Sequence, residues 1–388
     1  MDRKFFSNTL VVIIFFSIAV IATATSALGK EIDHDFFSNK LQESRHLTVT
    51  LPENYADNLG VTYPVLYVLD GRQQLPHTAG IAKTLQVYGE MPALIIVSVD
   101  STNRMRDLTP KMFPGVENSG KADAFLSFLV EELRPFIDQN YKTNNYNMLA
   151  GHSLGGLFAT YSLIVDPDAF QARFAFSPSL RFLGPELFKT LNSVVAKKRT
   201  SNVYFYMNVG AEQARVLDAF HTVTTILNDS SEKLSWTADE LPEETHFTTP
   251  IIGQFKAFRH LFGNWKLTLP LVEQGIPAVE AFYQSLSSRL GYAVVPEEAQ
   301  VNSAAYEVLD VTDNTDLASA LFELNLRNYP SSPNAFIGLS RVARNQGDFV
   351  RASELMEKAL GLVDTTDSRY TVLKNQLATL QQSIQSSD

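Results

Sequence analysis

"AGHSLGG", residues 150–156, lies between the strand-like run "YNML" and the helix-like run "LFATYSLIV". The stretch contains the pattern G-x-S-x-G, and a strand, a tight turn and a helix are the context that a nucleophile elbow requires. Its glycines suit that role, because a serine on a sharp turn is strained and the strand and helix must cross closely. We therefore predict that Ser153 is a nucleophile at the start of a helix; a glycine-rich connection without chemistry is the alternative.

Strand-like and helix-like runs alternate on both sides of this turn. Several of the strand-like runs are almost continuously apolar, as expected for strands buried on both faces of a parallel sheet. Residues 122–141 between two of them carry apolar side chains at helical spacing, and Pro135 is expected to kink or end that helix. The pattern predicts an α/β fold with a doubly wound, mainly parallel sheet over residues 35–275. The expected strands are residues 46–52, 63–70, 93–100, 146–151, 203–210 and 234–242.

A serine nucleophile needs a general base, and the sequence offers three histidines after Ser153. His246 follows the last strand-like run, where a loop at the carboxyl edge of the sheet is expected. His221 and His260 fall inside helical patterns and are expected to be packing or surface residues. In an α/β-hydrolase the order along the chain is serine, acid, histidine, which the choice of His246 allows.

The acid that orients His246 should follow the run at residues 203–210. Glu212 is the first candidate there, and Asp218 is the fallback one or two turns into the next helix. Glu212 can also be explained as a carboxylate at a helix start, which the helix dipole favours. A Ser–His dyad assisted by a carbonyl group or water remains a further alternative.

The oxyanion of a tetrahedral intermediate needs backbone N–H donors. The Leu154 N–H group is one candidate, because the helix N-terminus after Ser153 carries partial positive charge. The second donor is expected in the loop after the early strand, from Gly71 or Arg72, whose N–H groups should be exposed.

The stretch "NRMRDLTP", residues 103–110, follows another strand end. Arg104 and Arg106 are therefore candidates for substrate binding at the border of the site. The alternative for Arg106 is that it pairs with Asp107 or another nearby carboxylate and fixes the loop. The histidines and carboxylates show no metal-site spacing, and neither a metal nor an organic cofactor is implied.

The chain after residue 275 is mostly helical by pattern, with a helical connector over residues 276–312 and a helical region over residues 313–388. Ala318 and Phe322 recur 34 positions later as Ala352 and Met356, and Gly347 stands where a turn is expected. This spacing resembles a tetratricopeptide (TPR) helix-turn-helix repeat. The alternative is a generic helical hairpin. A TPR-like region predicts either a protein partner or packing against the preceding domain.

Composition and the first residues bear on partners and location. A net charge of −10 without a Lys/Arg-rich run argues against nucleic-acid binding, and the absence of cysteine excludes disulfides and a cysteine nucleophile. Residues 1–27 have a basic start, an apolar stretch and small residues, which is the layout of a secretory signal peptide. We expect export to the periplasm or the medium without a membrane span in the mature chain; an uncleaved anchor is the alternative.

Several blocks taken together resemble the putative esterase family of α/β-hydrolases, the esterase D-like group that includes siderophore esterases, feruloyl esterases and mycolyltransferases. These blocks are "YPVLYVLDG", "SVDSTNRMRDLTP", "FLVEELRPFIDQNY", "NMLAGHSLGGLFATYSL", "FAFSPSL" and "EETHFTTP". The resemblance implies Ser153 as nucleophile, Leu154 in the oxyanion hole and His246 as base, and leaves the acid open.

The function expected from residues and resemblance is an exported serine carboxylic-ester hydrolase that acts on a small siderophore-like or other polar ester. An acyltransferase or thioesterase with the same triad is one alternative. A weakly catalytic exported scaffold that binds a protein through its TPR-like region is the other.

Overall fold

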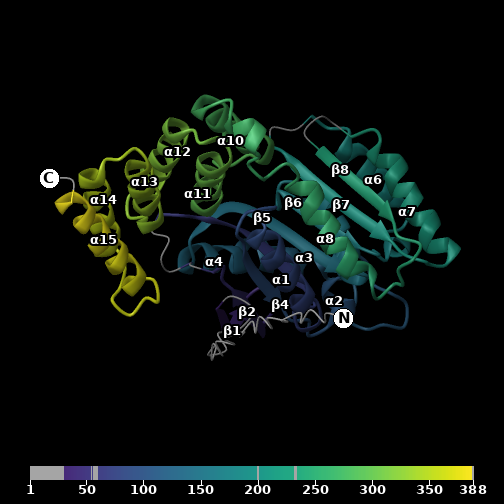
Figure 1. Ribbon diagram of the computed structural model, residues 1–388. Helices are drawn as coiled ribbons and strands as arrows, with labels where there is room; N and C mark the ends of the chain where they lie inside the picture. Colours follow the sequence, from purple (N-terminus) through teal and green to yellow (C-terminus); the bar gives the residue numbers. More distant parts are fainter. Residues whose placement is uncertain (1–29, 54, 56–59, 199–200, 231–233, 387–388) are drawn as a thin grey trace, which may run out of the picture.

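The computed structural model describes residues 30–53, 55, 60–198, 201–230 and 234–386. Its centre is an eight-stranded sheet in the order β1-β2-β4-β3-β5-β6-β7-β8 (Figure 1). Strands β1 and β2 pair antiparallel with each other, β2 pairs antiparallel with β4, and all other neighbours are parallel. The strands are β1 (Glu31–Ser38), β2 (Glu43–Thr50), β3 (Tyr63–Leu69), β4 (Ile95–Val99), β5 (Thr143–His152), β6 (Ala172–Phe176), β7 (Val203–Val209) and β8 (Leu234–Glu240).

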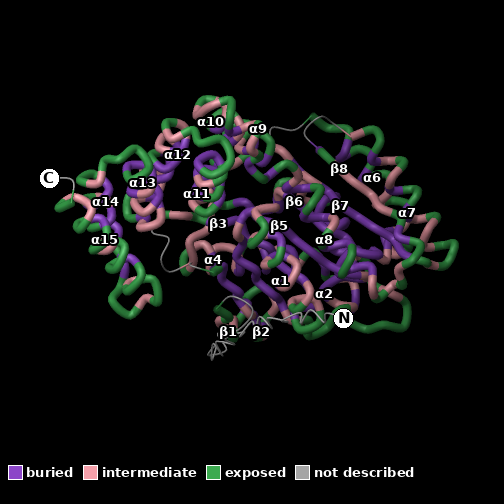
Figure 2. Tube along the Cα trace, viewed as in Figure 1, coloured by how far each residue is buried: buried purple, intermediate pink, exposed green. Residues whose placement is uncertain are grey.

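Both faces of the sheet are covered by helices, which is why the central strands are buried throughout (Figure 2). The sheet separates two cores, one on each face. Successive side chains of β3 point to opposite faces and therefore belong alternately to one core and the other. Tyr67 belongs to the core that contains Phe125 and Phe158, whereas Leu66 belongs to the core that contains Phe258. The predicted doubly wound, mainly parallel α/β sheet is confirmed.

Helices α3 to α7 lie over the first core, and α1 and α8 to α13 contribute to the second. In the first part of the chain the helices are α1 (Gly71–Val87), α2 (Arg104–Asp107), α3 (Ala122–Ser127), the π-helical η1 (Phe128–Leu133), α4 (Arg134–Asn140), α5 (Leu154–Val165), the 3₁₀ turn η2 (Leu180–Phe182), α6 (Pro185–Val195), α7 (Ala214–Leu227) and α8 (Thr249–Leu261). The later ones are α9 (Leu269–Val272), α10 (Ile276–Leu290), α11 (Glu298–Glu307), the π-helical η3 (Val308–Thr312), α12 (Thr315–Asn328), α13 (Pro333–Asn345), α14 (Phe349–Gly361) and α15 (Tyr370–Gln385).

Two strands, β1 and β6, are absent from the six that the sequence predicts. β1 is an edge strand whose exposed and half-buried side chains give no long apolar run, and β6 is only five residues long. The expected helix over residues 122–141 is present, but it passes through the π-helical stretch η1 immediately before Pro135. Pro135 has no N–H group for the regular hydrogen bond to the preceding turn. The wider π-helical turn before it accommodates this missing bond, so the helix continues instead of ending.

The helices after residue 275 extend from one end of the sheet (Figure 1). Helices α10 to α13 continue its second core, whereas α14 and α15 pack in a third, smaller cluster with the end of α13. Leu321 and Phe322 of α12 and Leu339 of α13 belong to the same buried cluster as Leu66 of β3. Helices α13 and α14 form the predicted hairpin, and Gly347 occupies the turn at φ 80°, a conformation that glycine adopts without strain. The assignment of this hairpin to the TPR class stays a prediction.

The N-terminal segment predicted as a signal peptide, residues 1–27, lies outside the described residues. Within the ranges that the structure describes, none of the helices has the length and apolar character needed to cross a bilayer.

Candidate active site

Ser153 occupies the sharp turn between β5 and α5. Its backbone has φ 58° and ψ −110°, a strained conformation for a residue with a side chain. The neighbouring glycines are required by close approach: a Cβ at Gly151 would lie 2.4 Å from the Gly155 backbone. The Ser153 N–H group donates to the Phe176 carbonyl oxygen at 2.9 Å, and Ser153 Oγ lies 3.2 Å from Ser179 Oγ. The local geometry predicted for a nucleophile elbow is therefore present.

The structure brings His246 and Glu212 together at the same edge of the sheet. His246 lies in the loop between β8 and α8, and its Nδ1 is 2.5 Å from Glu212 Oε1. Glu212 follows β7, and its side chain is 11% exposed. The two loops pack closely, because the Ala211 N–H group donates to the Glu244 carbonyl oxygen at 2.8 Å and a Cβ at Gly210 would lie 2.4 Å from that oxygen.

The other candidates for base and acid lie apart from Ser153. His221 is half exposed and pairs with Glu240 at 2.9 Å, and His260 is exposed with Asp239 as its nearest carboxylate at 3.6 Å. Asp218 is exposed on α7. Among the predicted acids, Glu212 is the one in contact with His246.

His152, the residue before the elbow serine, connects the elbow to the base. Its Nε2 is 2.7 Å from the His246 carbonyl oxygen, and the two imidazole rings are 4.7 Å apart between centroids. Burial, and secondly the neighbouring His246, lowers the pKa of His152 to about 4. His152 is therefore neutral near pH 7, so it can donate one N–H group to His246 without adding a positive charge beside it.

Two helices begin near Ser153: α5 starts directly after it, and Gln73 and Gln74 in the first turn of α1 line the same hollow as Ser153. Leu154 begins α5 and Gly71 begins α1, and first-turn N–H groups have no partner within their own helix. Of the two predicted alternatives for the second donor, the Arg72 N–H group is already engaged, because it donates to Asp100 Oδ1 at 3.1 Å. The carboxylate also accepts from Arg72 Nε at 2.7 Å, which holds the amide in that direction.

The two arginines of the predicted substrate-binding loop have different surroundings. Arg104 borders the hollow beside Ser153 and donates from Nε to Asp70 Oδ1 at 2.9 Å. Arg106 instead donates to both oxygens of Glu43, at 2.6 and 2.8 Å, and from Nε to Asp107. The structure contradicts substrate binding by Arg106, since its donors are used to fix the loop.

Two hollows meet at Ser153 and His246, which belong to the walls of both. The first has a volume of about 320 Å³ and the second about 240 Å³. The first is partly apolar, because Phe247 is 80% exposed and Ile251 is 45% exposed beside it. The first is lined by Gln73, Gln74, His77, Arg104, His152, Phe247, Pro250 and Ile251, and the second by Ser177, Pro178, Ser179, Leu180, Arg181, Glu212, Gln213 and Val216.

Sequence reasoning missed His152, Ser179 and Phe247 as parts of this site. His152 and Phe247 directly adjoin the predicted nucleophile and base, and that adjacency is the signal that could have found them. Ser179 had no such signal, since β6 was not predicted and the loop after it could not be placed at the carboxyl edge.

Comparison with known proteins identifies the family of the chain. The family model described as "Putative esterase" matches residues 38–269. The ferri-bacillibactin esterase BesA of Bacillus subtilis is 29% identical over 181 residues, which are 40% of this chain and 61% of that protein. The chain thus matches less than two thirds of the length of this relative.

Two solved structures extend the likeness. An IroE-like serine hydrolase from Shewanella oneidensis is 30% identical with a TM-score of 0.68, over 77% of this chain and 99% of that one. An uncharacterised protein from Capnocytophaga ochracea is 17% identical with a TM-score of 0.61, over 91% of this chain and 99% of that one. The second likeness concerns the fold alone, and it reaches into the C-terminal helices.

Proposed function

This chain belongs to the esterase family of α/β-hydrolases, and from that membership and the site geometry we propose that it hydrolyses carboxylic esters with Ser153 as the nucleophile. The observation that carries the proposal is the strained elbow of Ser153 in one site with the His246–Glu212 pair, whose Nδ1–Oε1 distance is 2.5 Å. A carboxylate bound to Nδ1 leaves Nε2 of a histidine as the proton acceptor.

In the proposed first step, the Ser153 hydroxyl rotates from Ser179 toward His246 and Oγ attacks the ester carbonyl carbon. His246 Nε2 takes the hydroxyl proton, and Glu212 stabilises the imidazolium that forms. The carbonyl oxygen becomes an oxyanion, for which we propose the N–H groups of Leu154 and Gly71 as donors. Collapse of the intermediate breaks the ester C–O bond, and His246 returns the proton to the leaving alcohol.

In the second step, water attacks the acyl group on Ser153 while His246 takes one of its protons. Collapse of the second intermediate releases the carboxylic acid and returns the proton to Ser153 Oγ. In both steps the same histidine first accepts a proton as a base and then returns it as an acid, as in other Ser-His-acid triads.

The proposed substrates are small polar esters, including siderophore-like ones. Two observations support this class: the name of the Bacillus subtilis relative, and the placement of Arg104 and Arg181 in the walls of the two hollows. A guanidinium group beside each hollow would favour anionic groups on the substrate. Arg104 already pairs with Asp70, so we expect its contribution to be smaller than that of an unpaired guanidinium.

We further propose that the chain is exported after cleavage of residues 1–27. The support is the basic Arg3 and Lys4 followed by an apolar stretch and small residues. Expression of the full chain in a bacterial host, with N-terminal sequencing of the protein recovered outside the cytoplasm, tests this proposal. An intact Met1 on that protein would contradict cleavage.

Hydrolysis of short p-nitrophenyl esters tests the catalytic proposal. The wild-type protein should turn over the esters and react with a fluorophosphonate at Ser153, whereas Glu212→Gln should lose about 10²-fold or more in kcat/KM. Asp218→Asn is the matched control and should retain wild-type rates. Equal losses in both variants, or fluorophosphonate labelling that persists in Ser153→Ala, would contradict the assignment.

A further inference from the structure

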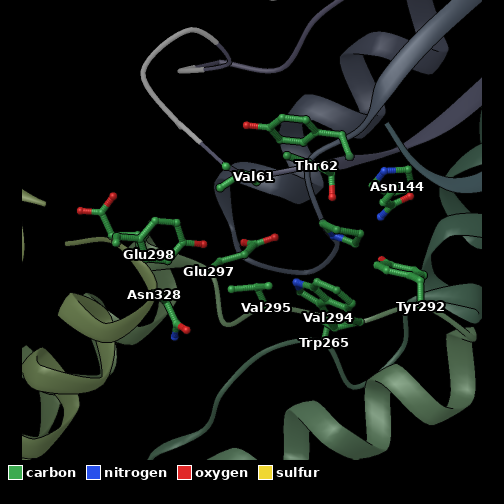
Figure 3. A pocket seen from close by; sticks show the side chains of 18 of the residues that line it. Val61, Thr62, Asn144, Trp265, Tyr292, Val294, Val295, Glu297, Glu298 and Asn328 are labelled. Atoms are coloured by element: carbon green, nitrogen blue, oxygen red, sulfur yellow. The ribbon is translucent and has the colours of Figure 1, made fainter. Parts of the chain in front are cut away.

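A further cavity, of about 460 Å³, lies at the amino edge of the parallel strands, opposite the edge that carries Ser153. Its walls come from the segment before β3, the start of β5, the links around α9 and α11, and the end of α12 (Figure 3). Thr62 and Asn144 lie on one side of the hollow, and Trp265, Tyr292 and Glu297 lie on the other (Figure 3). The cavity therefore spans the junction between the sheet and the C-terminal helices.

Two polar atoms in its wall are buried and have no hydrogen-bond partner among the described residues. They are Trp265 Nε1, on a residue that is 2% exposed, and the hydroxyl oxygen of Tyr292. A buried donor without a partner costs about 1–3 kcal/mol, and such groups are rare in native proteins. Their position in the wall of a cavity of this size indicates a bound molecule or water that would pair with them.

Glu297 provides an acceptor close to the Trp265 indole. The indole nitrogen lies on the side of Glu297 (Figure 3), although no hydrogen bond of acceptable geometry joins them. Burial raises the pKa of Glu297 to about 7, against the opposite effects of Gln300, Trp265 and the Ala93 N–H group. Gln300 Nε2 donates to one carboxylate oxygen at 3.3 Å. The indole N–H thus lies close enough to Glu297 to favour the charged carboxylate but in poor hydrogen-bond geometry, and the carboxylate retains acceptor capacity.

Several other polar side chains of the wall already have partners. Glu298 accepts from Ser332 and from Asn334, and Tyr329 donates to the Pro296 carbonyl oxygen at 3.0 Å. Arg327 pairs with Glu280 of α10 at 3.1 Å. Most of the remaining wall is apolar and consists of Val61, Pro64, Pro92, Ala93, Val294 and Val295.

We infer that this cavity is a second ligand site, separate from the active site, for a small uncharged molecule with an apolar body and a hydroxyl group. One hydroxyl can accept from Trp265 Nε1 and donate to the Glu297 carboxylate, which satisfies both groups at once. An anionic head group would face the carboxylates of Glu297 and Glu298. An ammonium group would leave the indole N–H without an acceptor. The volume lies within the range of small-molecule sites.

A molecule bound here contacts both the sheet and the C-terminal helices. Binding should therefore stabilise the whole chain, because a ligand that binds only the folded state raises its free energy of unfolding by mass action. The inference is independent of the esterase proposal, since none of the cavity residues belongs to the elbow or to the loops of His246 and Glu212.

Tryptophan fluorescence tests the inference directly. The chain has two tryptophans, Trp236 and Trp265, so Trp236→Phe leaves the cavity residue as the reporter. Benzyl alcohol, benzylamine and benzoate share one ring and differ in head group. We expect a saturable change of Trp265 emission and a rise in Tm with benzyl alcohol, and at least tenfold weaker responses with the other two.

Two variants locate the response. Glu297→Gln keeps an acceptor but removes the charge, so it should reduce the preference for benzyl alcohol over benzoate by tenfold or more. Val295 is 48% exposed at the wall, and Val295→Tyr should block binding while the protein still unfolds cooperatively. Ser153→Ala should bind as the parent does.

The result that overturns the site is the absence of a saturable response to all three compounds. A response to benzyl alcohol that survives Val295→Tyr would overturn its location. Equal affinities for the three compounds in the parent protein would overturn the chemistry of the head group. A benzyl alcohol response that disappears in Ser153→Ala would move the binding to the active site and overturn the inference.

Discussion

The two edges of the parallel sheet are built in different ways. At the carboxyl edge, the segments after six strands, β3 to β8, bring polar groups together, and hydrogen bonds such as the one between His246 and Glu212 hold side chains in place. At the amino edge, segments distant in sequence close over a cavity of mixed polar and apolar lining, whose wall contains the Trp265 indole N–H without a hydrogen bond of good geometry. At the carboxyl edge, hydrogen bonds position the side chains proposed for catalysis. At the amino edge, the cavity forms where the C-terminal region packs against the sheet.

The largest effect is expected from substitutions at the carboxyl edge that remove the side chains proposed for catalysis. Ser153→Ala and His246→Ala should each lower kcat/KM on p-nitrophenyl esters by about 10⁴-fold or more, because residues of a triad act as a unit. The double variant should be little worse than either single one. Urea denaturation checks that the free energy of unfolding stays within about 1 kcal/mol of the wild type; multiplicative losses would argue against a shared mechanism.

A substitution in the C-terminal helices should have the opposite signature. Phe322 is fully buried in the core that joins α12 to the sheet, so Phe322→Ala should lower the free energy of unfolding by about 3–5 kcal/mol. The kcat/KM of the folded fraction should remain within about twofold of the wild type. Exposed Val372→Ala on α15 is the control for a change without a cavity. A large loss of kcat/KM in folded Phe322→Ala would mean that the two edges are coupled.

The ion pairs of Arg106 with Glu43 and Asp107 predict how the stability of the fold depends on pH. Hydrogen bonds from Arg106 lower the pKa of Glu43 to about 2, so the pair stabilises the fold above the unfolded-state pKa near 4.5. We expect Glu43→Gln to lower the free energy of unfolding by about 2 kcal/mol at pH 7. The difference from wild type should shrink as the pH falls from about 4.5 to about 2, where Glu43 becomes protonated in both states.

Denaturation in urea at several pH values measures this effect. The matched control is Glu280→Gln, which removes an exposed pair with Arg327 and should cost less than about 0.5 kcal/mol. A Glu43→Gln penalty that stays constant down to pH 2, or one equal to that of the control, would contradict the role assigned to these ion pairs.

The smallest expected effect concerns His152, which positions the loop of the base. His152→Leu removes the donor to the His246 carbonyl oxygen and should lower kcat about tenfold, with a smaller change in KM. His152→Gln retains a donor and should recover most of the rate. Because the pKa of His152 is about 4, the pH dependence of kcat/KM above pH 5 should be the same in wild type and His152→Gln. Equal rates in both variants would show that the hydrogen bond has no positioning role.

The sequence by itself was enough to predict the α/β class, the elbow at Ser153 and His246 as the base, but it left the acid open between Glu212, Asp218 and no acid at all. These features depend on local rules: glycines at a sharp turn, apolar runs in buried strands, and loops that must follow strand ends at one edge. The same reasoning missed β1 and β6, because a half-exposed edge strand and a five-residue strand have weak local patterns.

Only the tertiary structure decided which polar groups were already used and where the C-terminal helices lie. Arg72 and Arg106 were reasonable candidates in the sequence, but partners from other segments, Asp100 and Glu43, bind the Arg72 amide and the Arg106 side chain. The cavity around Trp265 likewise joins segments separated by more than two hundred residues. Such long-range pairings depend on which surfaces meet when the sheet and helices pack, and the periodicity of one segment carries no information about its distant partner.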